Sequence, residues 1–309
     1  MSNFKLLDAQ AALAFVVSQA SYIERQVNEV QYPDIQYPQL IPVDTAASPW
    51  AKTVTYYSSD KYGKAGWING NADDIPMAGS EMAKTETQVH TAGIGYGYGL
   101  EEISQAQMLG VNLPAEDAAA ARRAYEEMVD RVALLGDSEK GFYGIINAPG
   151  VTAGAAVTGD WDTATPPQIL ADVNSALVSQ FTGTLFTSMA NTIVMPYERY
   201  LLLATRMVSE NSSVSILNWL LANNAYTAQT GQPLMIRGMR GLNTAGAGGT
   251  ARLVTYRRDP SVLKLHIPMP HRFLPVYQAG PIRWEVPGIF RLGGLDVRRP
   301  ADMTYIDGI

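Results

Sequence analysis

Residues 90–103, HTAGIGYGYGLEEI, carry glycine at every second position from Gly93 to Gly99. In an extended strand this spacing places the isoleucine and the tyrosines between the glycines on one face and only hydrogen atoms on the other. The stretch lacks the G-x-G-x-x-G spacing of a dinucleotide site, and the chain has no P-loop motif. Glycine inside a strand typically marks the close approach of another backbone. We therefore expect tight packing against this bare face, and bulky residues at Gly95 or Gly97 should disrupt folding.

The composition is that of a globular protein. A chain of 309 residues suits one large domain or two closely joined domains, and 47% apolar with 17% charged residues allows a sizeable core. The net charge of −6 argues against a dedicated nucleic-acid-binding protein, which would present a basic face. The absence of cysteine excludes disulfides, zinc–cysteine sites and cysteine nucleophiles. No apolar run reaches the ~18 residues of a membrane span, and a signal peptide is not evident. We expect a soluble, cytosolic chain with no membrane partner.

The N-terminal segment combines a helical pattern with a proline-rich one. Apolar residues recur every three or four positions over residues 6–30, which predicts an amphipathic helix that docks on another surface. Pro33, Pro38 and Pro42 follow it. Because each proline favours extended geometry in the residue before it, we expect residues 30–44 to form an extended arm without helix. Such an arm wraps its own domain or reaches a neighbouring subunit.

A long hairpin is predicted after the arm. Residues 52–62 and 86–98 are rich in strand-forming residues, and the segment between them, residues 63–80, is turn-rich and has little to bury. A lone pair of strands is marginal in water, so we expect the hairpin to lean on a partner. Deleting residues 66–79 is then expected to abolish assembly and leave a folded subunit.

The remainder of the chain mixes helices with strands. A helix is expected from Pro114 to just before Gly136. Its buried stripe is expected to comprise Ala118, Ala121, Tyr125, Met128, Val132 and Leu135. The capping-box sequence TPPQ at residues 165–168 opens a second helix. Further helices are expected over residues 196–206 and 214–225, with a short buried strand at 191–196. The last eighty residues read as strands at 250–258, 262–268, 271–277, 282–286 and 290–300. This order predicts an α+β fold with largely antiparallel strands.

Motifs for catalysis or metal binding are weak. His266 and His271 flank two prolines that spoil helical ligand spacing, and we interpret them, like His90, as structural histidines. The sequence GDSEK at residues 136–140 fails the G-x-S-x-G pattern of a serine hydrolase. The adjacent acids Glu126 and Glu127 read as a solvated helix surface. The acids and asparagines of residues 69–74 are either a calcium-like turn or, more simply, a polar hairpin tip. We predict no catalytic, cofactor-binding or metal-binding residues, no cofactor and no enzyme activity.

The order of these elements, together with two local motifs, resembles a known family. The predicted long helix ends in LLGD, from Leu134 to Asp137, and is followed by a G-x-x-N element from Gly144 to Asn147. With the C-terminal sequences LHIPMPHRFLPV and VPGIFRLGGLDVRRPADMTYIDGI, these motifs resemble the major capsid proteins of tailed bacteriophages, which have the HK97-type fold. The resemblance spans essentially the whole chain and points to a branch catalogued as a family of unknown function.

The resemblance implies a division of the chain into four parts. These are an N-terminal arm at residues 1–45, an extended loop at 46–99, a peripheral domain at 100–147 and 260–290 with a spine helix at about 115–135, and an axial domain at 148–259 and 291–309. Axial tips would meet around fivefold and sixfold axes. The alternating glycines would lie where the extended loop enters the peripheral domain.

The resemblance also implies a function and partners. The chain would self-assemble through hexamers and pentamers into an icosahedral phage head that encloses double-stranded DNA without sequence preference. Assembly would take place in the bacterial host cytoplasm, with portal and head accessory proteins. Because the arm begins almost at the first residue, we expect a separate scaffolding protein. Some members of the family form lysine–asparagine cross-links between subunits. Lys61 and Lys64 lie on the predicted hairpin, and the sequence leaves open whether this chain forms such cross-links.

Three alternatives remain open from the sequence. An encapsulin-like nanocompartment would share the fold and enclose a cargo enzyme. An α+β hydrolase whose acids cannot be paired from sequence is a second alternative, and a cell-surface or tail-associated binding protein is a third. The size of the oligomer separates a shell from the last two, and its contents separate a phage head from a nanocompartment.

Overall fold

The computed structural model describes residues 34–68, 75–102, 104 and 113–309. The helix expected over residues 6–30 and the acidic turn at 69–74 lie outside them. The helices are α2 (Tyr37–Leu40), α4 (Leu113–Leu135), α5 (Pro166–Gly183), α6 (Tyr197–Thr205), α7 (Ile216–Asn223) and α8 (Ala225–Thr230), with short 3-10 turns at Ala247–Gly249 and Pro300–Asp302. The first nine strands are β1 (Val43–Asp44), β2 (Thr53–Tyr62), β3 (Gly79–Gln88), β4 (His90–Gly93), β5 (Tyr96–Gly99), β6 (Gly136–Asp137), β7 (Phe142–Tyr143), β8 (Thr152–Ala155) and β9 (Thr192–Pro196). The others are β10 (Met235–Met239), β11 (Arg252–Tyr256), β12 (Leu263–His266), β13 (Met269–Phe273), β14 (Tyr277–Gly280), β15 (Arg283–Val286), β16 (Gly288–Leu292), β17 (Gly294–Val297) and β18 (Met303–Asp307).

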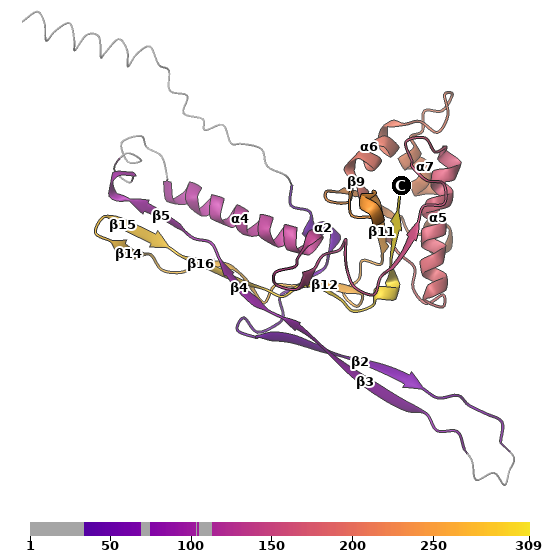
Figure 1. Cartoon of the computed structure of the whole chain (residues 1–309), viewed down its shortest axis with the longest axis horizontal. Coiled ribbons are helices and arrows are strands. Elements are labelled where there is room, and N and C mark those ends of the chain that lie inside the picture. The colour runs from indigo at the N-terminus through magenta and orange to yellow at the C-terminus, as the bar shows by residue number, and fades with distance from the viewer. Residues whose placement is uncertain (1–33, 69–74, 103, 105–112) are drawn as a thin grey trace, which may run out of the picture. The chain divides into compact units, whose positions relative to one another are not determined.

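The strands form several small sheets. A five-stranded sheet has the order β10-β9-β11-β18-β8, and three-stranded sheets have the orders β1-β12-β17, β13-β16-β4 and β14-β15-β5. Strands β2 and β3 pair with each other, as do β6 and β7 (Figure 1). Parallel pairing occurs between β1 and β12, β9 and β10, and β8 and β18, while the other described pairs are antiparallel. The predicted α+β class is confirmed, although β8, β10 and β18 were not expected.

The five-stranded sheet separates two apolar cores. Along β9, Val194 belongs to the first core, whereas Ile193 and Met195 belong to the second. Along β11, Val254 belongs to the first core and Leu253 to the second. Successive side chains of a strand point to opposite faces, so an uninterrupted run of buried residues supplies both cores. The first core also takes residues from α2, α4 and β12, and the second from α5, α6 and α7. Helix α5 contacts β18, and α6 contacts β9 and β10 (Figure 1).

The alternating glycines lie against the backbone of a neighbouring segment, as expected. Strands β4 and β5 pair with β16 and β15, respectively. A Cβ atom would lie 2.8, 2.4 and 3.0 Å from a carbonyl oxygen of residues 284–288 if it were added at Gly93, Gly95 and Gly97, respectively. At Gly99 the nearest such oxygen would be 3.8 Å away, which is ordinary contact. The first three glycines therefore make room for a backbone, and the fourth does not.

The predicted return strand over residues 86–98 is wrong. The chain there belongs to three strands in three different sheets: the end of β3, then β4, then β5. The partner of β2 begins earlier, at Gly79, and extends to Gln88. Pairing with β15 and β16, nearly two hundred residues further along the chain, divides a stretch whose local pattern reads as continuous.

Part of the predicted extended arm is helical, which corrects a second expectation. Residues Tyr37–Leu40 form the one-turn helix α2, with proline in its first turn, where no intrahelical N–H is required. Ile41, just before Pro42, has the expected extended backbone (φ −124°, ψ 131°). Tyr37, Leu40 and Ile41 are all buried in the first core. This portion of the arm therefore wraps its own subunit.

Helix α4 and the turn after it agree largely with the sequence motifs. Gly136 follows the helix with φ +84°, the left-handed conformation that favours glycine at a helix end. A Cβ atom at Gly144 would lie 2.4 Å from the carbonyl oxygen of Leu134, so the G-x-x-N turn packs against the helix end. Ala121, Tyr125 and Val132 are buried as expected, but Leu135 is 37% exposed and the expectation for it is wrong. At the end of the helix the buried positions shift to Ala133 and Leu134.

The later helices agree with their sequence signals, with one difference. Helix α5 begins with the expected cap: Gln168 Oε1 accepts hydrogen bonds from the backbone N–H (2.8 Å) and the hydroxyl (2.7 Å) of Thr165. Helix α6 runs from Tyr197 to Thr205, one residue shorter at each end than the predicted 196–206. The single helix expected over residues 214–225 is instead two, α7 and α8. The break lies at the buried Asn224, whose side chain accepts the Thr227 N–H and caps α8.

Candidate assembly surfaces

The β2–β3 hairpin is exposed along most of its length. Its strands pair over ten residues each, from Thr53 with Gln88 to Tyr62 with Gly79 (Figure 1). Beyond the first few residues at its base, nearly every side chain of both strands is exposed. Both faces of the ribbon are therefore without cover from the rest of the chain.

Large apolar side chains are concentrated on this hairpin. Trp67 and Met77, near the tip, are fully or almost fully exposed at 107% and 86%, and Met82 on β3 is 70% exposed. The other exposed large apolar residues of the hairpin are Tyr57, Tyr62, Ile68 and Ile75. Scattered apolar residues are normal on a surface, but a series of large ones on an element with no core of its own marks an interaction surface.

The base of the hairpin borders a groove of about 460 Å³. Tyr56 and Glu86 of the hairpin line one side, and Lys140, Phe142 and Asp296 line the other. The guanidinium of Arg298 lies 4.6 Å from the centre of the Tyr56 ring, which ties the hairpin to the region after β17. The groove thus contains aromatic rings together with charges of both signs.

A buried carboxylate fastens the arm to α4. Asp130 is fully buried and accepts hydrogen bonds from the backbone N–H groups of Gln36 (2.9 Å) and Tyr37 (2.8 Å) at the start of α2. It also forms an ion pair with Arg240, after β10. A negative charge suits the N-terminal end of a helix. One side chain therefore joins the arm, the long helix and the end of β10.

A second charged cluster holds β1 to its sheet. His266 is buried, with Nε2 3.3 Å from Asp296 Oδ2 and Nδ1 3.6 Å from Asp44 Oδ2. Lys264 Nζ lies 3.2 Å from the same oxygen of Asp44. The pKa of Asp44 is lowered by a hydrogen bond from the backbone N–H of Ala46 and by Lys264, although burial acts in the opposite direction.

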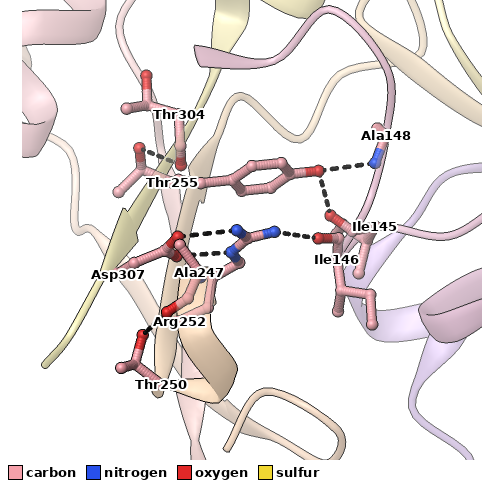
Figure 2. Close-up of polar contacts among 10 residues, drawn as sticks. Ile145, Ile146, Ala148, Ala247, Thr250, Arg252, Thr255, Thr304 and Asp307 are labelled. Carbon is pink, nitrogen blue, oxygen red and sulfur yellow. Dashed lines mark hydrogen bonds and ion pairs between the residues drawn. The ribbon is translucent and has the colours of Figure 1, made fainter. Parts of the chain in front are cut away.

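A third cluster connects the five-stranded sheet to the G-x-x-N turn (Figure 2). The guanidinium of Arg252 donates to both oxygens of Asp307 (2.7 and 2.9 Å) and to the carbonyl of Ile146 (2.7 Å). The Tyr305 hydroxyl donates to the carbonyl of Ile145 and accepts from the backbone N–H of Ala148. Arg252 also lies over the Tyr305 ring at 4.5 Å. Two side chains of the sheet thus fix the loop that leaves α4.

The ionisation of this third cluster follows from its contacts. Burial alone would raise the pKa of Asp307, but hydrogen bonds from Arg252 and from the backbone N–H of Ala247 more than offset it and leave the pKa below its ordinary value. The same pairing raises the pKa of Arg252. Burial raises the pKa of the Tyr305 hydroxyl to about 12. At neutral pH the cluster is therefore a charged pair beside a neutral phenol.

The three histidines lie in different surroundings among the described residues. His90 lies in β4, His271 stacks on Tyr125, and His266 lies between two aspartates. The described residues contain no group of three or more histidines and acids that could hold a metal ion. Glu126 is not a purely solvated residue as expected, because it accepts a 2.8 Å hydrogen bond from the Tyr37 hydroxyl. Among the described residues, no helix is long and apolar enough to cross a membrane.

Comparisons with known proteins agree with the architecture. A family model described as major capsid protein matches residues 63–309. The capsid of Myoviridae phage XM1 superposes with a TM-score of 0.80 at 19% identity, covering 94% of this chain and 98% of that chain. The capsid of an empty GTA particle superposes at 0.61 with 11% identity (96% and 97% coverage), and the structure titled Mycobacterium phage Bobi at 0.61 with 12% identity (96% and 97%). No curated protein matches in sequence.

These likenesses confirm the HK97-like capsid fold that the sequence motifs suggested. Members of the family are structural proteins, and capsid homologues form multimeric shells from copies of themselves. The family match begins within the hairpin, just after β2, and extends to the C-terminal residue; it includes the second core and the part of the first core that follows residue 63. The chain therefore belongs to the major capsid protein family, the proteins that build the virion shell of a phage.

Proposed function

We propose that copies of this chain close into an icosahedral head of hexamers and pentamers, and that the β2–β3 hairpin makes the principal contact between neighbouring subunits. The observation that carries this proposal is the hairpin itself, with a full ladder of ten paired residues and large apolar side chains exposed on it. Burial of apolar surface is worth about 25 cal/mol per Å². A neighbouring subunit that covers these side chains stabilises both the hairpin and the shell.

The contents and partners of the shell belong to the same proposal. We infer that the head encloses double-stranded DNA without sequence preference. The net charge of −6 supports containment by the closed wall rather than by strong affinity for phosphates. A separate scaffolding protein, a portal and head accessory proteins would act with the chain in the host cytoplasm. The chain would have no catalytic activity of its own.

The division into parts also stays a proposal. Residues 1–45 would be the arm, 46–99 the extended loop, 100–147 and 260–290 the peripheral domain, and 148–259 and 291–309 the axial domain. The burial of α2 in the first core joins residues 37–41 of the proposed arm to their own subunit.

The decisive experiment shortens the hairpin. Tyr62 and Gly79 are directly paired, so a two-residue Asn-Gly turn can replace residues 63–78 without disturbing the register. The change removes the exposed tip with Trp67 and Met77. We expect a folded subunit whose Tm stays within about 2 °C of the parent, and no closed particles by light scattering and negative-stain microscopy.

The matched control keeps the length of the hairpin and changes a polar surface residue on it. Ser59→Ala, in the exposed part of β2, should leave particle yield unchanged. Both proteins are expressed alone and with any co-encoded scaffolding protein, because the lone chain need not close. Normal particles from the shortened hairpin would refute the proposed contact. Particles that contain a cargo enzyme and no DNA would instead identify a nanocompartment.

A further inference from the structure

Arg291 holds both ends of the hairpin segment with one side chain. It lies on β16, in the middle of the sheet β13-β16-β4, and is only 6% exposed. Its guanidinium donates to the carbonyl of Pro49 before the hairpin (3.0 Å) and to the carbonyl of Val89 after it (3.4 Å). The third bond goes to the hydroxyl of Thr91 on β4 (3.0 Å). The entry and the exit of the hairpin are therefore fastened to the same sheet.

The chemistry of this contact is specific to arginine. All three hydrogen-bond acceptors are neutral oxygens, so within the part of the chain that the structure describes no carboxylate bonded to the guanidinium offsets the burial of its charge. The Trp50 ring, 6.0 Å from the guanidinium carbon, adds a weak cation–π contact. Burying a cation among neutral partners is unfavourable as a means of stability alone. The planar fork of arginine, however, presents donors on three separate nitrogens, each bonded to a different acceptor here, whereas the donors of lysine all lie on one nitrogen and cannot reproduce this spacing.

The Arg291 contact lies at the base of the hairpin, where a small change in angle displaces the far end of the hairpin. Val89 is the single residue between β3 and β4, and its N–H donates to the carbonyl of Lys52 (2.9 Å) to close the base. From this base the ten residues of β2 extend roughly 33 Å, at about 3.3 Å per residue. A looseness of about 5° at the base would move the far end by about 3 Å. A displacement of this size would break packed side-chain contacts between subunits.

We propose that Arg291 is a positioning residue: it locks the base of the hairpin and so aims the hairpin at the neighbouring subunit. The inference rests on the proposed role of the hairpin in assembly, but the lock is a property of the single subunit. It can therefore be measured on subunits before any shell forms.

The absence of native cysteine makes a direct measurement possible. Lys61→Cys on the exposed part of β2 and Arg131→Cys on the exposed face of α4 provide two sites for spin labels. Pulsed electron–electron double resonance on the full-length subunit in solution then reports the distribution of distances between the spin label on the hairpin and the one on the helix. Arg291→Met removes all three donors, and Arg291→Lys keeps the charge but loses the fork.

We expect the distance distribution to broaden by about 3 Å or more in both Arg291 variants. The matched control is Arg272→Met, because the exposed Arg272 on β13 lies 5.8 Å from the same Trp50 ring. In the control, the distance distribution should be as narrow as in the parent. If a folded Arg291→Met subunit, verified by its thermal unfolding, also keeps that width, the lock is disproved.

Two further measurements keep the test decisive. Should Arg291→Met fail to fold, Arg291→Lys, which keeps the buried charge, is measured in its place, and an unchanged width in that folded variant would overturn the proposal. Particle yield is measured separately. Broader distributions with lower yield support both the lock and its role in aiming the hairpin. Broader distributions with undiminished yield would retain the lock but refute its role in aiming the hairpin; the shortened hairpin tests the contact itself.

Discussion

At the scale of single residues, the alternating glycines show at which positions close packing requires the absence of a Cβ atom. Gly95 and Gly99 look equivalent in the sequence, yet only the first faces a carbonyl oxygen at a distance that excludes a Cβ atom. The spacing predicts a bare face and close packing. It cannot predict which backbone fills the space, because β15 and β16 lie nearly two hundred residues away and reach this site only through the fold.

This difference leads to a prediction with an internal control. Gly95→Ala would place a Cβ atom 2.4 Å from the carbonyl of Val286 and 2.8 Å from the Cα of Pro287, so backbone atoms must move. We expect a loss of about 1–3 kcal/mol in the free energy of unfolding. Gly99→Ala meets nothing closer than 3.8 Å and should stay within about 0.5 kcal/mol of the parent. Urea unfolding of the soluble subunit measures both, and equal stabilities would contradict the close-approach explanation.

At the scale of elements, the stability of helix α2 in the arm comes from contacts with distant parts of the chain. Helix α2 is only four residues long, far below the length at which a helix is stable alone, and it exists because Tyr37 and Leu40 enter the first core and Asp130 caps its start. The prolines correctly predict the extended residue before Pro42. They do not reveal the helical turn, because its stability comes from a carboxylate 93 residues away.

The anchor of the arm can be tested against a surface pair on the same helix. Asp130→Ala would leave two backbone N–H groups and Arg240 without their buried partner. We expect a loss of about 2–4 kcal/mol in the free energy of unfolding, and faster proteolysis around residues 34–44. Glu127→Ala removes a half-exposed ion pair with Arg123 and should cost less than about 0.5 kcal/mol. Unaltered proteolysis in Asp130→Ala would mean that apolar burial alone holds the arm.

At the scale of the whole molecule, two cores share one sheet. Residues 35–309 form a single compact unit, and neighbouring residues of β9 and β11 serve opposite cores. The sequence predicts β9 as buried, since an apolar run ending in proline is distinctive. It does not predict β10, whose glycine and arginine interrupt the apolar pattern, or β18, where polar and apolar residues are mixed. Those strands are specified by their neighbours in the sheet.

The Arg252–Asp307 pair should make the acid stability of the subunit depend on one carboxylate. The pKa of Asp307 is lower in the folded chain than its ordinary value near 4. A lowered pKa contributes stability that is fully present above about pH 4 and is lost as the pH falls through the folded value. Asp307→Asn should therefore be less stable than the parent at pH 7, and the difference should shrink as the pH falls below about 4.

Urea unfolding at several pH values measures this difference. Asp162→Asn is the control, because Asp162 is exposed and its partner Arg199 also pairs with Asp160, so the substitution should show little effect at any pH. Asp44 and Asp259, whose pKa values are also lowered, remain in both proteins and cancel from the comparison. If the difference in the free energy of unfolding between the parent and Asp307→Asn stays constant from pH 7 to about pH 2, the carboxylate contributes by packing and not by its charge.

The hairpin has one more consequence, for the life of the subunit before assembly. A two-stranded ribbon has two open edges, and free edges invite pairing between chains and aggregation. Along this ribbon Asp60 and Lys61 on β2 and Glu81, Lys84 and Glu86 on β3 interrupt the apolar residues with charge. Charged edge residues of this kind discourage indiscriminate pairing. If the hairpin contacts a neighbouring subunit as proposed, we expect these charges to limit indiscriminate pairing of the ribbon before assembly.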